Sequence, residues 1–527
     1  MFQEISQKQI AEITDGSRAN GNDELAITQI AIDSRQILHP QKTLFVALRG
    51  AKADGADFVP QLVELGVKTF LVHQDFDERA FPDICFIKVS DTRRALQLLA
   101  KYQRSLFKNP VVSIAGSNGK TIVKEWLGQI LGQKFAVAKS PKSYNSQVGV
   151  PLSIFGIESY HQVAILEAGI SKAGEMAALE EMIKPNLGIF TNLGTAHQEG
   201  FESMDSKLQE KLSIFEGSNF LIYCADQKQV SDQIESRFAP EKRIGWSDRA
   251  GFEFTRSVKF KGNGSRLILM KSDLSTHTFQ VPFTDVASLE NITHVIIAAM
   301  TLGLSVESIQ EGIAHLKSVD MRLTLKAGIN DSLLIDDTYN NDLAGLKVAL
   351  DFMQQQRPKR RKILILSDLL QQGSPEKIYG EVSELIKKYQ FDLLFGVGKE
   401  IFYLEKEFSE SFQGFRSTEE LLAKLDPESF ANDMILITGA RVFGFEEVVN
   451  RLQQRIHGTT LEINLNALTH NYNFYKKLIS PKTKVMVMVK AFAYGGGAVE
   501  IANQIQTMGA DYLGVAFSDE GVALRKQ

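Results

Sequence analysis

The chain alternates short apolar runs with longer stretches in which apolar residues recur every three or four positions. The runs VVSIAG, VAILEAG, LGIFTNLG and FLIYCAD have the length of β-strands, and each leads into polar or turn-forming residues. This alternation is typical of βα units, which build a parallel sheet with helices on its faces. It predicts an α/β fold with a doubly wound domain over residues 108–319.

The same alternation predicts further domains on either side. Before residue 108 the apolar runs are AITQIAID, TLFVALRG, KTFLVHQ and ICFIKV, and after residue 319 they are SLLIDD, KILILSD, LLFGVG and MILITGA. Near His457 the pattern restarts, and there VMVMV predicts a fully buried strand. A chain of 527 residues also exceeds what one core usually serves. We predict four domains, at 1–107, 108–319, 320–457 and 458–527.

Composition and charge narrow the classes of function. The net charge is −4 and no run of five basic residues occurs, which argues against nucleic acid as the main partner. Cys85 and Cys224 both lie in apolar runs, so we interpret them as reduced core residues. No apolar stretch reaches the roughly 20 residues of a membrane span, and the N-terminus lacks the pattern of a signal peptide. We expect a cytoplasmic protein.

The stretch VVSIAGSNGKTIVKEW carries the clearest chemistry. A strand-like run ends at Ala115, a helix is predicted from Lys120, and between them lie Gly116, Ser117, Asn118 and Gly119. The first glycine of the P-loop consensus is missing, but the glycines, the lysine and the hydroxyl of Thr121 that bind phosphate and Mg²⁺ are present. A helix start contributes only about 0.3 to 2 kcal/mol to anion binding. Lys120 and a metal must therefore contribute most of the binding free energy for the phosphates. The alternative is a glycine-rich turn with a solvated lysine.

Four polar residues follow the ends of predicted parallel strands. Lys120 follows VVSIAG, Glu167 ends VAILE, and Asn192 and His197 follow LGIF. Because ligands of such folds bind at the carboxyl ends of the strands, we expect the four residues on one rim. Each alone has a structural explanation, but four residues of phosphate or metal chemistry together favour a site.

These motifs resemble the Mur ligases. The resemblance rests on GSNGKT, LEAG, TNLGTAH, EKLSIF around Lys211, Glu290-Asn291, Arg322, DDTYNND from Asp336 and IDSRQI...LFVALRGAKADGADF, and it covers about the first 455 residues. Within the family the chain most resembles the type that adds D-alanyl-D-alanine to UDP-N-acetylmuramoyl-tripeptide. The resemblance implies a three-domain fold, ATP and Mg²⁺, and an acyl phosphate intermediate. We expect the ligase part to act as a monomer.

The resemblance also implies roles for single residues. It places ATP at the loop from Gly116 to Thr121, adenine at Asn291, and the ribose or phosphates at Arg322 and Asp337. It places substrates at Ser34, Asn145, Tyr339 and Asn340, and Mg²⁺ at Thr121, Glu167, His197 and Lys211. The sequence departs from the family pattern at Ile122, Ser146 and Asn341-Asp342-Leu343.

Lys211 is a special case among the implied metal ligands. On sequence alone, it is more simply a solvated lysine on an amphipathic helix, and a lysine with a pKa near 10.4 is a cation that cannot bind a metal. The resemblance implies that this lysine is carbamylated, which turns it into an anionic oxygen ligand.

The last seventy residues resemble the start of alanine racemase. Val489 to Gly495 read VKAFAYG, similar to the family's pyridoxal phosphate motif. The resemblance implies that Lys490 binds this cofactor covalently and that Tyr494 approaches its phosphate. Phe492 and Gly496 depart from the motif. A (β/α)₈ barrel needs on the order of 250 residues, so we expect a truncated racemase region without racemase activity.

Two alternatives belong to other classes. The first is a P-loop switch protein with a C-terminal docking module; it would want a strand ending in Asp and a base-reading motif such as NKxD, and neither is evident. The second is that the C-terminal segment serves only as a docking or stabilising module.

Overall fold

The computed structural model describes most of the chain. The described residues are 4–21, 25–37, 39–50, 54–194, 200–261, 264–316, 324–338, 342–354, 356, 358–370, 374–454, 463–480 and 483–526. They divide into two compact units, one made of residues 1–107, 154–159 and 457–527 and the other of residues 108–153 and 160–456. In the described residues, no helix combines the length and the apolar character that crossing a membrane requires.

The N-terminal part contains a five-stranded sheet in the order β2-β7-β6-β5-β4. Strands β4 to β7 are parallel and β2 is antiparallel at the edge. Asp91 caps the long helix α3 by accepting hydrogen bonds from the backbone N–H groups of Arg93 and Arg94. The elements are β1 (Ile5–Ser6), α1 (Gln7–Thr14), β2 (Ser17–Ala19), β3 (Ala26–Ile27), β4 (Gln29–Ala31), β5 (Thr43–Val46), α2 (Val59–Leu65), β6 (Thr69–His73), β7 (Cys85–Val89) and α3 (Thr92–Leu106).

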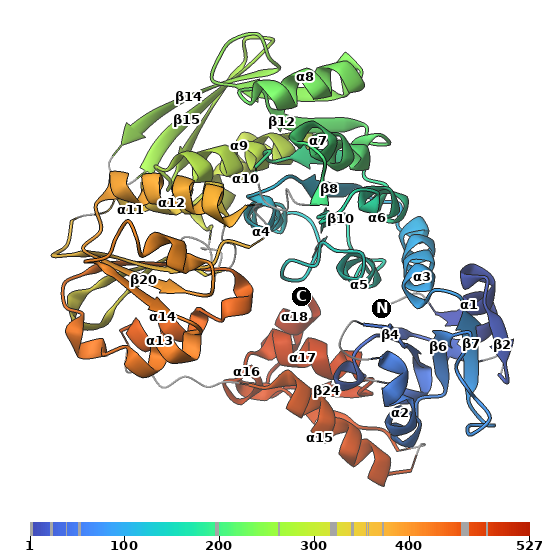
Figure 1. Ribbon diagram of the computed structural model, residues 1–527. Helices are drawn as coiled ribbons and strands as arrows, with labels where there is room; N and C mark the ends of the chain where they lie inside the picture. The colour runs from blue at the N-terminus through green and yellow to red at the C-terminus, as the bar shows by residue number, and fades with distance from the viewer. Residues whose placement is uncertain are drawn as a thin grey trace. The chain divides into compact units, whose positions relative to one another are not determined.

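A nine-stranded sheet forms the centre of the second unit, in the order β16-β15-β14-β13-β12-β11-β8-β10-β9 (Figure 1). Strands β8 to β13 are parallel, and the chain runs outward from β8 in both directions, as predicted for a doubly wound sheet. The strands are β8 (Val111–Ala115), β9 (Val137–Lys139), β10 (Val163–Glu167), β11 (Leu187–Phe190), β12 (Phe220–Cys224), β13 (Arg243–Ser247), β14 (Phe254–Lys261), β15 (Gly264–Lys271) and β16 (Thr276–Val281).

The antiparallel strands β14, β15 and β16 were not predicted. They extend the parallel sheet at its β13 edge, where β14 first pairs in parallel with β13. Beyond Arg256 the residues of β14 are mostly exposed. Its apolar signal is therefore weaker than that of the parallel strands, which are buried on both faces.

One face of the central sheet is covered by α4, α9 and α10, whose apolar side chains share a core with β8, β10, β11 and β12. Helix α9 buries ten of its residues, including the polar Asn291, Thr293 and His294. The helices of this part are α4 (Lys120–Leu131), α5 (Gly149–Phe155), α6 (Glu175–Ile183), α7 (Met204–Leu212), α8 (Lys228–Arg237), α9 (Val286–Thr301) and α10 (Val306–Ala314).

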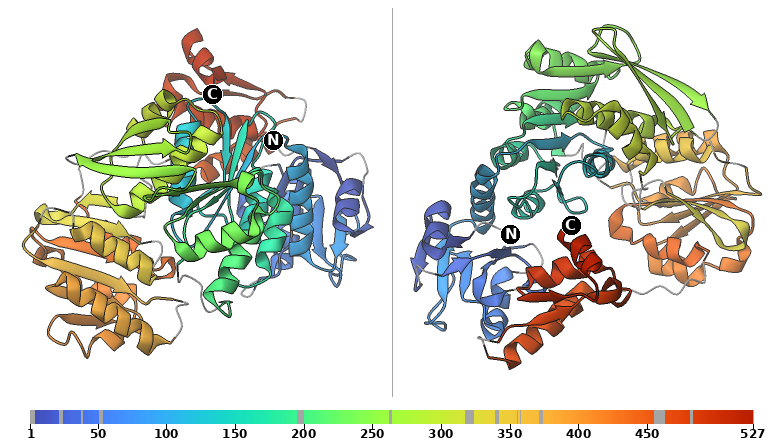
Figure 2. Two further views of the ribbon diagram at one scale, coloured as in Figure 1. Left: turned by 90° about the horizontal axis from the view of Figure 1, so that it is seen from above. Right: turned by 180° about the vertical axis from the view of Figure 1, so that it is seen from behind.

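A six-stranded sheet follows in the order β17-β18-β22-β19-β20-β21, parallel except for β17. Helices α11 and α12 pack on one face and α13 and α14 on the other (Figure 2). The elements are β17 (Thr324–Ala327), β18 (Leu333–Asp337), α11 (Leu343–Gln354), β19 (Lys362–Ser367), α12 (Pro375–Tyr389), β20 (Leu393–Val397), β21 (Phe412–Phe415), α13 (Thr418–Lys424), β22 (Met434–Thr438) and α14 (Glu446–Leu452).

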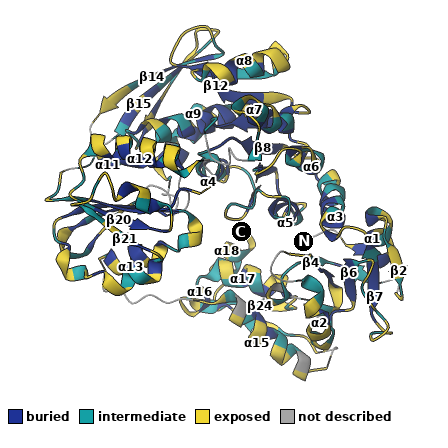
Figure 3. Cartoon of the chain, viewed as in Figure 1, coloured by how far each residue is buried: buried dark blue, intermediate teal, exposed yellow. Residues whose placement is uncertain are grey.

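The last segment holds a parallel pair of strands and four helices. These are α15 (Leu465–Leu478), β23 (Met486–Met488), α16 (Lys490–Tyr494), α17 (Ala498–Thr507), β24 (Tyr512–Gly514) and α18 (Ser518–Lys526). The prediction of a fully buried strand here was wrong, because Met486 is 60% and Met488 42% exposed. Figure 3 shows the contrast with the buried central strands. Val485 and Val487 pack against a small core of Tyr472, Ile505 and Met508, so among the described residues only one face of this segment is covered.

Candidate active site

The loop between β8 and α4 depends on two glycines in conformations that other residues avoid. Gly116 has φ +141° and Gly119 has φ +82°. A Cβ atom on Gly116 would lie 2.1 Å from Thr191 Oγ1, and one on Gly119 would lie 2.3 Å from Asn291 Oδ1. The chain therefore passes close to two other elements at this point. Asn291, predicted to bind the nucleotide, lies directly against the loop.

The residues after β11 hold this loop in place. The backbone N–H of Ser117 donates to Asn192 O at 2.8 Å, and that of Asn118 donates to Asn192 Oδ1 at 3.0 Å. From the other side, Thr191 Oγ1 donates to Asn118 O at 2.6 Å, and the Gly194 N–H donates to Ser117 Oγ at 2.8 Å. Asn192 thus lies on the predicted rim and shapes the loop.

A buried carboxylate faces the start of α4. Glu167, the last residue of β10, is fully buried. Its Oε2 accepts a hydrogen bond from Thr121 Oγ1 at 3.2 Å, and its Oε1 lies 3.1 Å from the ammonium of Lys124. Thr121 Oγ1 is also 3.0 Å from Ser143 Oγ. Carboxylate and hydroxyl oxygens are the donors that Mg²⁺ prefers, so the predicted pair Thr121 and Glu167 fits this ion.

The fit rests on oxygen donors rather than on a cluster of acidic residues. In the described part of the chain, no three His, Cys, Asp or Glu side chains gather where they could hold a metal. His197, the other predicted metal-binding residue besides Lys211, lies outside the described residues. Among the described residues, the groups left to hold a metal are therefore Thr121, Glu167 and Lys211, together with oxygen atoms of the nucleotide.

The amino groups of three lysines surround the loop. Lys120 Nζ donates to Gly116 O and Ser117 O, both at 2.9 Å. Lys207 Nζ donates to Gly194 O at 2.6 Å, and Lys211 Nζ donates to Gly116 O at 3.2 Å. The loop lies in a strongly positive environment, which suits the phosphates of a nucleotide.

Burial shifts the pKa of two of these lysines. Desolvation lowers the pKa of Lys207 to about 8, with Asp342 opposing the shift and Lys120 adding to it. The pKa of Lys211 lies well below its usual range because of desolvation and, secondarily, the charges of Lys120 and Lys207. The simpler interpretation of Lys211 as a solvated lysine was wrong. Lys207 was not predicted, although its spacing of four residues from Lys211 on α7 indicates a shared face.

The other predicted residues have different positions. Asn145 lies beside the end of β10, where its carbonyl accepts the Gly169 N–H at 2.8 Å. Asp337 is buried at the end of β18 and accepts a hydrogen bond from Thr438 Oγ1 at 3.4 Å. Ser34 begins a short 3₁₀ turn that Asp33 caps. Arg322, Tyr339 and Asn340 lie outside the described residues.

The two predicted pyridoxal phosphate residues do not form an enclosed site. Lys490 is half-buried and Tyr494 is 65% exposed. Ala491 to Tyr494 all have φ between 52° and 57°, which is a left-handed turn of non-glycine residues. The described part of this segment therefore does not fit the cofactor as a closed binding site.

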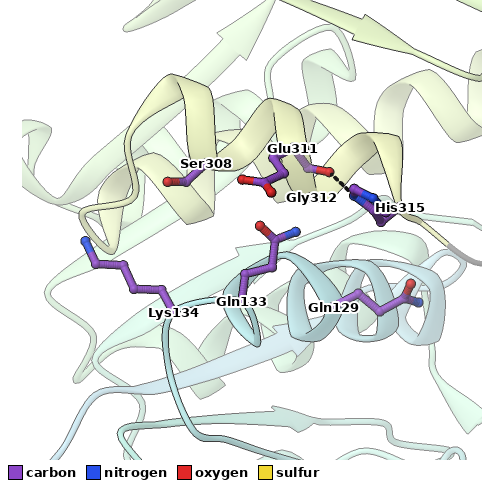
Figure 4. Close-up of a pocket in the computed structure, with 7 residues that line it drawn as sticks. All are labelled: Gln129, Gln133, Lys134, Ser308, Glu311, Gly312 and His315. Atoms are coloured by element: carbon purple, nitrogen blue, oxygen red, sulfur yellow. Dashed lines mark hydrogen bonds between the residues drawn. The ribbon is translucent and has the colours of Figure 1, made fainter.

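A hollow of about 710 Å³ lies between α4 and α10 (Figure 4). The residues that line it come from the last part of α4, the turn after it, and α10: Gln129, Gln133, Lys134, Ser308, Glu311, Gly312 and His315. Lys120 lies at the opposite end of the 12-residue helix α4, which is roughly 18 Å long. The hollow is separate from the candidate active site.

The parallel sheet, the loop before α4 and the carboxylate at its rim define a P-loop α/β protein of the nucleotide-binding class. The chain belongs to the Mur ligase family. The Mur ligase middle domain matches residues 114–299, and the catalytic domain of the Mur ligase family matches residues 26–104. The N-terminal domain of alanine racemase matches residues 463–527.

Relatives and solved structures agree with this assignment. The UDP-N-acetylmuramoyl-tripeptide--D-alanyl-D-alanine ligase of Bacillus subtilis (strain 168) is 27% identical over 459 residues, which cover 84% of this chain and 97% of that protein. The structure of MurF from Acinetobacter baumannii superposes with a TM-score of 0.73 at 23% identity, covering 85% of this chain and 99% of the other. MurF from Thermotoga maritima, solved in complex with ADP, has a TM-score of 0.67 at 20% identity and covers 80% and 96%. These structures share the three-domain Mur ligase fold.

Proposed function

We propose that this chain joins D-alanyl-D-alanine to UDP-N-acetylmuramoyl-tripeptide with the use of ATP. The proposal is supported by relatives named UDP-N-acetylmuramoyl-tripeptide--D-alanyl-D-alanine ligase, which match this chain along nearly their whole length. It is also supported by the P-loop and by the oxygen donors Thr121 and Glu167 beside it.

The observation that carries the proposal is the burial of Lys211 beside the phosphate-binding loop. Its amine contacts the Gly116 carbonyl, and burial lowers its pKa well below the usual range. A neutral amine can attack CO₂, which forms a C–N bond and releases one proton to leave an anionic carbamate. A ligase that binds metal through a carbamate requires a buried lysine with a lowered pKa beside the phosphates, and Lys211 meets that requirement.

The proposed reaction has two steps. A carboxylate oxygen of the peptide attacks the γ-phosphorus of ATP; the new O–P bond forms as the bond to ADP breaks, which yields an acyl phosphate. The amine of D-alanyl-D-alanine then attacks the acyl carbon, inorganic phosphate leaves, and the amine loses a proton. The first step brings two anions together, so the ammonium of Lys120 and the backbone N–H groups at the start of α4 would stabilise the charge on the transferred phosphoryl group.

Mg²⁺, when bound, would neutralise phosphate charge and align the phosphoryl group with the attacking carboxylate. We propose Thr121 and Glu167 as ligands of one ion and His197 with carbamylated Lys211 as ligands of a second. The short distance between Thr121 and Glu167 supports the first pair. For the second, the support is the neutral state of Lys211 that its surroundings favour.

We assign the remaining predicted residues to the three substrates. Asn291 would contact adenine, which its position against Gly119 supports. Arg322 and Asp337 would contact the ribose or phosphates, and Asn145, Tyr339 and Asn340 the peptide or dipeptide. Ser34 would bind the uridine nucleotide in the N-terminal domain.

The proposed domain boundaries are 1–107, 108–319, 320–457 and 458–527. They are supported by the strands, because each range holds a separate sheet or strand pair. We further propose that the ligase part is monomeric and works in the cytoplasm, in keeping with its two free, buried cysteines. Residues 458–527 would be the incomplete start of an alanine racemase, whose pyridoxal phosphate site this segment does not enclose by itself.

The deciding experiment measures phosphate release from ATP with UDP-N-acetylmuramoyl-tripeptide and D-alanyl-D-alanine, omitting each substrate in turn. We expect sustained release, and the amide product, only when both are present. Phosphate release that depends on neither substrate would overturn the ligase and favour the P-loop switch.

A further inference from the structure

Lys124 is a fully buried cation next to the proposed metal ligand Glu167. It lies one turn after Lys120 on α4, and its side chain has no solvent exposure. An ammonium has three N–H groups and is costly to bury unless all of them meet acceptors. Lys124 Nζ lies 3.1 Å from Glu167 Oε1 and 3.1 Å from Glu125 Oε1, donates to Ser140 O at 2.8 Å, and donates to Lys142 O as well.

Among the described residues, the Glu167 carboxylate has one hydrogen bond, at Oε2, and one ion pair, at Oε1, which accepts no hydrogen bond. One oxygen accepts from the Thr121 hydroxyl, and the other faces the Lys124 ammonium. Both side chains are fully buried, so the carboxylate has little freedom to turn. The ammonium therefore sets its positive charge directly against the carboxylate that is proposed to bind the metal.

The same ammonium also holds the loop between β9 and α5. The Lys124 ammonium donates to the carbonyl groups of Ser140 and Lys142 in this loop. In addition, Ser140 Oγ accepts the backbone N–H of Glu167 at 3.2 Å. Further along, Ser143 Oγ contacts Thr121 Oγ1 and Asn145 O accepts the Gly169 N–H. Residues 140–145, which we call the rim loop, thus run beside the proposed metal site and carry Asn145.

We propose that Lys124 is a positioning residue that couples the metal site to the rim loop. Its ammonium positions the Glu167 carboxylate to bind the metal, and it also positions the rim loop to bind the peptide substrate. The metal site and the peptide site are therefore held in a constant arrangement relative to each other. The inference rests on the proposed function, in which Glu167 binds Mg²⁺ and Asn145 contacts substrate.

The test compares Lys124→Met with Lys139→Met in the full chain. Methionine keeps much of the length of the side chain and removes the charge. Lys139 is the matched control because its ammonium also pairs with Glu125 but its side chain is 40% exposed. The readouts are Mn²⁺ affinity in the presence of ADP, followed by the electron paramagnetic resonance signal of free Mn²⁺, and hydrogen exchange of the rim-loop amides.

We expect Lys124→Met to weaken Mn²⁺ binding by roughly 10- to 100-fold, as is typical when the partner of a metal ligand is removed. Its rim-loop amides should exchange faster, while ADP binding in a chelator stays near that of the unsubstituted protein. Lys139→Met should leave all three measurements unchanged. A folded Lys124→Met protein that binds Mn²⁺ as tightly as the unsubstituted protein, or more tightly, would overturn the inference.

Ser140→Ala provides a second variant in case Lys124→Met does not fold. It removes one hydroxyl and with it the contact to the Glu167 N–H, while the ammonium stays. We expect a smaller loss of Mn²⁺ affinity together with faster exchange in the rim loop, and unchanged values for both would overturn the coupling. If the unsubstituted protein shows no metal-dependent ADP binding and no ligation, the proposed function fails; if it shows both and the variants match it, only this inference fails.

Discussion

Lys211 shows how the surroundings of one residue decide its chemistry. Lysine on a solvated helix face keeps its proton, but here α7 turns the side chain into the protein, against the phosphate-binding loop. The ammonium groups of Lys120 and Lys207 make a third positive charge unfavourable and thereby lower the pKa of Lys211 further. The free amine is the form that can react with CO₂.

We therefore predict that Lys211→Ala abolishes ligation, a fall of roughly a hundredfold or more, because it removes a metal ligand. The measurement is formation of the amide product by chromatography. Added formate or acetate should restore part of the activity by supplying the missing carboxylate. Full activity of the alanine variant without rescue would contradict the carbamate.

Glu290, next to Asn291 on α9, provides a pH-dependent prediction at the same scale. Burial raises its pKa to about 7, with Arg256 opposing the shift, against 4.5 for the free side chain. Between these values the folded protein holds a proton that the unfolded chain has lost, so stability from this residue decreases as the pH rises through the window. Glu290→Gln has no such proton.

The variant should therefore gain stability over the unsubstituted protein between about pH 5 and about pH 8, by up to roughly 3 kcal/mol. Urea unfolding followed by tryptophan fluorescence measures this directly, because both tryptophans, Trp126 and Trp246, belong to the central part of the chain. A stability difference that does not change with pH would contradict the assignment.

At the scale of elements, the site depends on close packing between β11 and the 3₁₀ turn that follows α7. Gly188 in β11 faces Phe215, in the 3₁₀ turn that follows α7. A Cβ atom at Gly188 would lie 2.4 Å from Phe215 Cδ1. The strand that leads to Asn192 and the turn that follows the helix of Lys211 can pack this closely only because residue 188 has no side chain.

Gly188→Ala should accordingly destabilise the central domain by about 1–3 kcal/mol, the usual cost of overpacking. Gly217→Ala is the matched control, since its Cβ would be 3.5 Å from the nearest atom, Glu180 Oε1, an ordinary contact. We expect the control to stay within about 0.5 kcal/mol of the unsubstituted protein. Urea unfolding by tryptophan fluorescence compares the two, and equal stabilities would contradict the predicted clash.

At the scale of the whole molecule, the proposed function divides the work between separate parts. The phosphate-binding loop lies in one compact unit, and the N-terminal domain with Ser34 lies in the other. Each has its own sheet and core. Loss of one activity should therefore leave the other in place.

Lys120→Ala tests this division. It should remove acyl phosphate formation, because the charge that holds the phosphates is lost, while binding of the uridine nucleotide stays largely intact. Trapping of the acyl phosphate measures acyl phosphate formation. Calorimetry with the UDP-linked peptide measures binding of the uridine nucleotide. Loss of both together would show that the two functions are not separate.

Much of this protein could be predicted from its sequence because the signals are local. The strands around VVSIAG, VAILE and LGIF are continuous apolar runs, and burial on both faces of a parallel sheet produces such runs. The loop before α4 could be identified because a strand, a glycine-rich loop, a lysine and a threonine follow one another in that order. Because the strands are parallel, Lys120, Glu167 and Asn192 could be placed on the same rim of the sheet. Strand β14 was missed and the burial of strand β23, which is covered on one face only, was misjudged, because burial of a strand depends on what packs against it.

The tertiary structure alone decided which charges meet. Lys124 contacts Glu167 and the rim loop only after β9, β10 and α4 are assembled, and no local pattern marks it among the chain's lysines. Lys207 and Lys211 likewise owe their lowered pKa values to burial and to Lys120, distant in sequence. Periodicity and turn residues thus determined the strands and the loop, because these follow from neighbouring residues. The electrostatic state of the site follows from desolvation and proximity, which only folding creates.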